Sequence, residues 1–107
     1  MAWQLSYYNA KVAEQLEAWP FGIRAGFLRI AELMQVYGPD IGMPHTKAMG
    51  AGLFEVRAKG REGNGRAFYC TLAGERIVIL HAIIKKTDKT PVRELTKARA
   101  RQKEVQT

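Results

Sequence analysis

The sequence predicts a small α+β domain, an antiparallel-rich sheet of about four strands with an N-terminal helical hairpin and a C-terminal helix. Two observations predict this class. Residues 9–37 have the apolar spacing of two amphipathic helices, and residues 53–84 have the patterns of three strands joined by turns. The 107 residues are enough for one domain over 1–107, but not for two.

The N-terminal elements follow from local signals. Residues 3–7 alternate between apolar and polar as a short strand, whose pairing direction the pattern leaves open. Asn9 is a typical N-cap for the first helix. Pro20 ends that helix or begins the second one, which Gly38-Pro39 terminates near residue 37.

Residues 38–52 contain four Gly and two Pro and are interpreted as a loop. Residues 53–59 then alternate, residues 66–72 favour a second strand, and residues 77–84 are apolar on both faces, as in a central strand. Thr90-Pro91 predicts the start of a basic helix that extends to about residue 104. We expect the helices mainly on one face of the sheet, and charged side chains on the other face.

Positive charge is concentrated in the second half of the chain. Residues 1–46 carry a net charge of −1, and residues 47–107 carry +8. Small basic domains often bind polyanions, of which nucleic acid is the commonest. An acidic protein partner is the competing interpretation, and a solvated basic surface is the third.

Composition excludes several classes of protein. No apolar run approaches the roughly 18 residues of a membrane span, and residues 1–8 lack the pattern of a secretory signal. We therefore expect a cytoplasmic protein without membrane contact. The single Cys70 excludes an intramolecular disulfide and a Cys-based zinc site and is interpreted as a core residue, and His45 and His81 make a poor metal set. We expect no metal and no cofactor.

Basic side chains on or beside the predicted strands form the candidate site. Arg57 lies within one strand, Arg66 begins the next, and Lys85 and Lys86 end the third. Because neighbouring strands are about 4.8 Å apart, these groups can converge. Arg binds phosphate oxygens and stabilises transition-state charge, and a crowded Lys can move a proton. The alternative is that these side chains solvate a sheet edge.

Two side chains near this patch have two interpretations each. Tyr69 can stack on an unstacked base or belong to the core, and His81 can do acid–base chemistry or be a core histidine. The glycines of residues 60–65 lead no helix and so form no phosphate loop. Glu55 and Glu62 stand apart in the sequence, which disfavours a metal-dependent nuclease.

Four motifs occur in order along the chain: Leu53-Phe54-Glu55-Val56-Arg57; Gly65-Arg66-Ala67-Phe68-Tyr69; the apolar run 77–84 with His81, followed by Lys85-Lys86; and Lys89-Thr90-Pro91 with Glu94. In combination they resemble the HigB-like branch of the RelE/ParE superfamily, the toxins of bacterial and phage type II toxin–antitoxin modules. Members of this branch are often described as phage-derived proteins. The resemblance covers essentially the whole chain.

The resemblance implies a RelE-like fold and a metal-independent endoribonuclease, a hydrolase that cleaves mRNA in the ribosomal A site and inhibits translation. In such enzymes the substrate 2′-hydroxyl attacks the adjacent phosphate. By position, the resemblance implies catalytic roles for Arg57, Arg66, Lys85 and Lys86, and it matches Tyr69 to a tyrosine of the family. Lys59, Tyr69, His81 and Arg93 are the candidates for RNA contact. The identity of the proton carriers stays open, because Glu55 stands where some relatives carry a second basic residue.

Two other functions stay open on the same fold: a ParE-like inhibitor that binds DNA gyrase, and a non-catalytic binding module. The resemblance also implies a helix-turn-helix antitoxin as partner, through which alone the complex would bind operator DNA. That antitoxin would either cover the cationic face or dock on the helices and obstruct entry to the ribosome.

Overall fold

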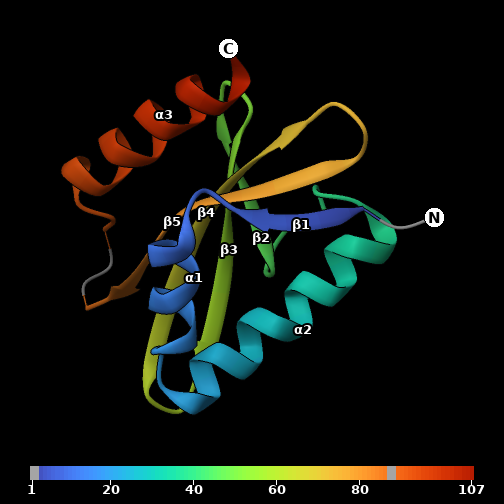
Figure 1. Cartoon of the computed structure of the whole chain (residues 1–107). Helices are drawn as coiled ribbons and strands as arrows, with labels where there is room; N and C mark the ends of the chain where they lie inside the picture. Colours follow the sequence, from blue (N-terminus) through green and yellow to red (C-terminus); the bar gives the residue numbers. More distant parts are fainter. Residues whose placement is uncertain (1–2, 87–88) are drawn as a thin grey trace.

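The structure is a computed structural model that describes residues 3–86 and 89–107. The elements run in the order β1 (Gln4–Tyr7), α1 (Ala10–Glu17), α2 (Phe21–Tyr37), β2 (Thr46–Gly50), β3 (Leu53–Gly60), β4 (Gly63–Leu72), β5 (Arg76–Lys85) and α3 (Val92–Gln106). Within the described residues the fold is α+β, with three helices and one five-stranded mixed sheet in the order β1-β5-β4-β3-β2 (Figure 1).

The sheet has one strand more than the sequence predicts. The additional strand is β2, which lies in the segment interpreted as a loop and pairs antiparallel with β3. Glycine and proline around β2 hide its strand pattern, and a register shift between Ala48 and Gly50 interrupts the pairing. At the opposite edge, β1 pairs parallel with β5, the direction that the pattern left open. The apolar run 77–84 lies in β5, an interior strand as predicted, although β4 holds the middle of the sheet.

Both N-terminal helices pack on one face of the sheet. Asn9 caps α1 as predicted, because its side chain accepts a hydrogen bond from the Val12 amide at 3.0 Å. Helix α1 packs chiefly on β5 and α2 on β3, so the predicted hairpin is only partly right. Gly26 allows α2 to approach β3 closely, since a Cβ there would lie 2.6 Å from the Lys59 carbonyl oxygen.

Helix α3 packs on the other face, which corrects the prediction that the helices lie mainly on one side. Side chains from β3, β4 and β5 form a second apolar core beneath it, together with Ala98 of the helix: Leu53, Phe68, Cys70, Val78 and Leu80. Figure 1 shows α3 and α2 separated by the sheet. The helix begins at Val92 with Pro91 as N-cap, so Thr90 does not cap it as predicted.

Polar bonds fix α3 along its length. Arg99 donates to the Met49 carbonyl at 2.9 Å and Gln102 donates to the Ala51 carbonyl at 2.8 Å, so the helix holds the turn between β2 and β3. Among the described residues, no helix is long and apolar enough to cross a bilayer.

Candidate nucleic-acid interface

Three rows of mainly polar side chains cross β3, β4 and β5 on the face that α3 only partly covers. Residues two apart along a strand share a face, and directly opposite residues have Cβ atoms about 4.5–5.5 Å apart. From the end of the hairpin inward, the rows are Lys59, Asn64 and Lys85; Arg57, Arg66 and Ile83; and Glu55, Phe68 and His81. Lys47 of β2 is paired with Glu55.

A buried carboxylate holds two arginines together in these rows. The Arg57 Nη1 atom lies 2.7 Å from Glu55 Oε2, and Arg66 Nε lies 3.9 Å from the same oxygen. Glu55 is only 3% exposed. Burial of Arg66, followed by repulsion from Arg57, lowers the pKa of the Arg66 guanidinium, and Glu55 opposes this shift. The guanidinium stays charged at neutral pH because arginine starts from a very high pKa.

The carboxylate lines a hollow of about 400 Å³, called the Glu55 hollow below. Its lining side chains come from β2, β3, β5, the segment that leads into α3, and α3 itself: Lys47, Met49, Glu55, Arg57, Lys85, Lys89, Thr90 and Leu95. Four of these side chains are cationic and one is anionic. Cations that converge on one concave surface favour a polyanion, and RNA phosphates fit that requirement.

A smaller neighbouring hollow shares Arg57 with the Glu55 hollow. Its lining residues are Met43, Pro44, Arg57, Lys59, Asn64 and Arg66. Arg66 is largely buried, with its side chain 8% exposed, and its Nε atom has no hydrogen-bond partner among the described residues. The two hollows bring Arg57, Arg66, Lys85 and Lys59 to one continuous region. Three of the four residues of the predicted convergent patch lie here, and the fourth, Lys86, does not.

Lys86 and Arg93 lie outside this region. Lys86 is exposed beyond the end of β5, and with Arg93 it lines a third hollow on the other side of Lys85. The Arg93 side chain is 87% exposed, and its Nε lies 3.5 Å from Glu94 Oε2. Both therefore lie at the margin of the cationic region, next to Lys85 and Lys89.

His81 fits its core interpretation. Its Nε2 lies 2.5 Å from Glu94 Oε1, its ring stacks against Phe68, and its side chain is 5% exposed. The hydrogen bond from His81 lowers the pKa of the Glu94 carboxyl. This pair fixes the first turn of α3 to the sheet, so His81 is shielded from a strand of RNA.

Tyr69 lies on the opposite face of the sheet from Arg66, because residues three apart along a strand point in opposite directions. It is fully buried, stacks on Phe54 at 5.4 Å and donates from its hydroxyl to the Pro39 carbonyl at 2.5 Å. Burial raises the pKa of this hydroxyl. The ring is therefore not available to stack on a base, which corrects its assignment to RNA contact. Cys70 is a buried core residue, as predicted, and burial raises the pKa of its thiol to about 11.

Sequence reasoning missed Lys47 and Lys89, which line the Glu55 hollow, and it also missed Glu55 itself. The alternation of β3 places it on the same face as Arg57, and this signal was present in the motif Leu53-Phe54-Glu55-Val56-Arg57. Within residues 3–86 and 89–107, no three His, Cys, Asp or Glu side chains form a group that could hold a metal ion.

Fold and site together define a small α+β protein that carries a cationic hollow around one carboxylate. The chain belongs to the family of phage-derived Gp49-like proteins (DUF891), whose family profile matches residues 14–103. The match includes α2 and all the residues of the Glu55 hollow. No curated protein matches the chain significantly.

Proposed function

We propose that this protein is the toxin of a type II toxin–antitoxin module, a HigB-like member of the RelE/ParE superfamily that cleaves mRNA on the ribosome. The observation that carries the proposal is the Glu55 hollow, where cationic side chains from three strands surround a buried carboxylate. Membership of the phage-derived Gp49-like family supports it.

The proposed reaction is transesterification within the RNA. The 2′-oxygen attacks the adjacent phosphorus, a P–O2′ bond forms and the P–O5′ bond breaks. The products are a 2′,3′-cyclic phosphate and a 5′-hydroxyl end. The 2′-hydroxyl must lose a proton and the departing 5′-oxygen must gain one, so the site needs a proton acceptor and a proton donor.

The side chains of the Glu55 hollow, together with Arg66 of the neighbouring hollow, supply these roles. Glu55 accepts the proton of the 2′-hydroxyl, because it is the carboxylate that lines the hollow. Arg57 and Arg66 stabilise the negative charge that develops on the phosphate oxygens. Lys85, which enters from β5, protonates the departing oxygen. Lys47 and Lys89 bind the phosphates on either side, since both line the same hollow.

The proposed partners are the ribosome, its mRNA and a helix-turn-helix antitoxin, through which the complex binds operator DNA. A net charge of +8 in residues 47–107 favours approach to ribosomal RNA. A gyrase inhibitor that acts by binding protein needs no such cluster around a buried carboxylate.

Primer extension on mRNA in a cell-free translation reaction tests the function. The expected result is truncated transcripts that appear only when ribosomes translate the message, and that disappear with Arg66→Ala. Intact mRNA in the presence of active translation would rule out the proposed ribonuclease activity. Inhibition of DNA gyrase by the protein would instead favour the ParE-like alternative.

A further inference from the structure

A second concave surface lies on the opposite face of the sheet, between β1, α1 and α2. Two adjoining hollows share Tyr7, Phe27 and Leu28, and together they are called the Tyr7 groove. Leu16 and Leu5 extend the apolar lining at its two ends. Leu28 is 51% exposed and Tyr7 is 36% exposed, so the groove presents apolar side chains to the surface.

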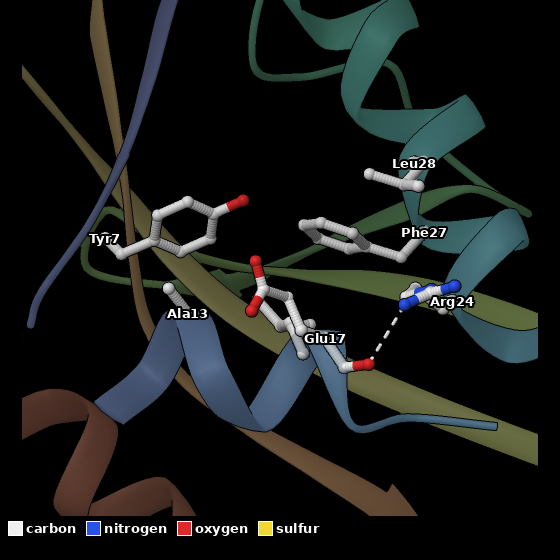
Figure 2. A pocket seen from close by; sticks show the side chains of 7 residues that line it. Tyr7, Ala13, Glu17, Arg24, Phe27 and Leu28 are labelled. Carbon is white, nitrogen blue, oxygen red and sulfur yellow. Dashed lines mark hydrogen bonds between the residues drawn. The ribbon is translucent and has the colours of Figure 1, made fainter. Parts of the chain in front are cut away.

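One end of the groove pairs a carboxylate, that of Glu17, with a guanidinium at its rim, that of Arg24. Figure 2 shows the Glu17 carboxylate pointing into the hollow between the rings of Tyr7 and Phe27, with the Tyr7 hydroxyl directed into the same space. Burial and the nearby Glu17 charge raise the pKa of the Tyr7 hydroxyl. Arg24 Nη1 donates to the Glu17 backbone carbonyl at 3.0 Å, which holds this guanidinium at the rim (Figure 2).

The chemistry of this end suits a cation. A carboxylate supplies an ion pair, and two aromatic rings supply faces that attract an ammonium or guanidinium group. The hollow at this end has a volume of about 270 Å³. Pockets for whole small molecules span about 300–1,000 Å³, so this one suits a single long side chain.

The strand beside the groove determines which backbone conformation a bound peptide would need. β1 is an edge strand. The amides of Gln4 and Tyr8 donate to carbonyls of Glu75 and Ile79, next to and within β5, whereas the Trp3 amide donates to Gln35 of α2. By the alternation of a strand, Leu5 and Tyr7 direct their amides and carbonyls to the outer edge. Such an edge pairs with an extended peptide.

We propose that the Tyr7 groove binds an extended segment of a partner protein, which pairs with β1 and inserts an arginine or lysine side chain toward Glu17. The segment carries apolar side chains next to that basic residue, and these pack on Leu28 and Phe27. An antitoxin could cover the cationic face or dock on the helices, and binding in the Tyr7 groove is docking on the helices. The identification of the partner as an antitoxin rests on the proposed function.

The charge of the groove separates this mode from the other one. A partner that covers the Glu55 hollow must be acidic, because that hollow carries four cations. The Tyr7 groove has no net charge, because Arg24 and Arg29 offset Glu17 and Glu32. A basic side chain fits it at one point, where the Glu17 carboxylate lies between the rings of Tyr7 and Phe27 (Figure 2). The groove and the Glu55 hollow lie on opposite faces of the sheet, so a bound segment leaves the Glu55 hollow open.

The test is an NMR titration of the ¹⁵N-labelled full chain with two octapeptides of alternating valine and threonine. One peptide has a central arginine and the other has a central glutamate. The expected result is that the arginine peptide binds about fivefold more tightly, the size of a partly exposed ion pair. Shifts should concentrate at Leu5, Tyr7 and Phe27, and exchange of the Leu5 and Tyr7 amides with solvent should slow.

Two variants on the same helix provide the matched comparison. Glu17→Gln should remove the preference for the arginine peptide, whereas Glu14→Gln, which makes the same charge change outside the groove, should preserve it. Equal loss in both variants, equal affinity for both peptides, or shifts confined to the face of Arg57 would overturn the inference. Concentration-dependent shifts at Tyr7 without peptide would assign the groove to a second copy of the chain and overturn it as well.

The titration and the cleavage assay fail independently. Glu17→Gln should cleave mRNA as the unchanged protein does, since Glu17 lies across the sheet from the Glu55 hollow. A protein that binds the arginine peptide in the groove but never cleaves mRNA would support this inference and remove the proposed activity.

Discussion

Replacing Glu55 with Gln separates catalysis from binding in the proposed site. The amide keeps the shape of the carboxylate and still accepts a hydrogen bond from Arg57, which lies 2.7 Å away. It cannot take a proton from the 2′-hydroxyl. Loss of a general base typically costs about 10²–10⁴-fold in rate, so cleavage should fall by at least 100-fold.

The same substitution should strengthen RNA binding. It removes one negative charge from a hollow lined by four cations, and a unit charge at about 4 Å in a wet site is worth about 1 kcal/mol. We therefore expect RNA affinity to rise about threefold to tenfold. A rate that falls while affinity rises is the signature of a proton acceptor.

The substitution also weakens the fold, but not enough to unfold it. Removing one partner of a buried ion pair costs about 3–5 kcal/mol. Arg57 is 27% exposed and can regain water, whereas Arg66 is 8% exposed and loses its counter-charge, so we expect a loss of about 3 kcal/mol, at the low end of that range. A domain of this size has about 5–15 kcal/mol of stability and remains folded.

Primer extension, RNA binding by fluorescence anisotropy and urea denaturation measure the three effects, with Glu14→Gln as the control. Cleavage within about threefold of the unchanged protein would refute the role of Glu55 as proton acceptor, because it lies far below the expected loss. A parallel fall in affinity and rate would show that Glu55 only supports the structure of the site.

Three further predictions follow from the placement of the other residues. Arg66→Ala should reduce the cleavage rate about 10²–10³-fold. Lys86→Ala should reduce it far less, because Lys86 lies at the margin of the cationic region. Equal losses for the two variants in primer extension would contradict this. Tyr69→Phe should lower the free energy of unfolding by about 1–3 kcal/mol, through loss of its bond to a backbone carbonyl, with cleavage unchanged. Because His81 lowers the pKa of the Glu94 carboxyl, Glu94→Gln should destabilise the protein above pH 4.5. The difference in urea midpoint between this variant and the unchanged protein should shrink as pH falls through the lowered pKa of the folded state. A difference that stays constant with pH would argue against the His81–Glu94 pair.

The order of helices and strands could be predicted because local patterns govern it. Asn9 and the apolar spacing of residues 10–37 define α1 and α2, and alternation defines the faces of β3. β2 was missed because four glycines and two prolines across residues 38–52 mask a short strand whose pairing comes from tertiary contact with β3. The position of α3 depends on which face of β4 and β5 is left uncovered, and both faces of β5 are apolar.

The candidate site could be predicted only where strand register was simple. Arg57 and Arg66 are cross-strand partners, so their convergence follows from a tight hairpin. The RNA contact expected of Tyr69 is wrong and its core interpretation is right, because the two-residue period of a strand places it on the opposite face from Arg66. Glu55 was missed because it has no second carboxylate near it in sequence that would suggest a catalytic pair. Its partners Lys47, Arg57 and Arg66 lie on three strands, and only the folded sheet brings them together.

The chemistry of the cut ends tests the central claim most directly. Message from a reconstituted translation reaction, with and without ribosomes, can be mapped for new 5′ ends that carry either a hydroxyl or a phosphate. We expect 5′-hydroxyl ends paired with 2′,3′-cyclic phosphates, present only with translating ribosomes and absent with Glu55→Gln. Uncut message, or 5′-phosphate ends made by attack of water, would contradict it.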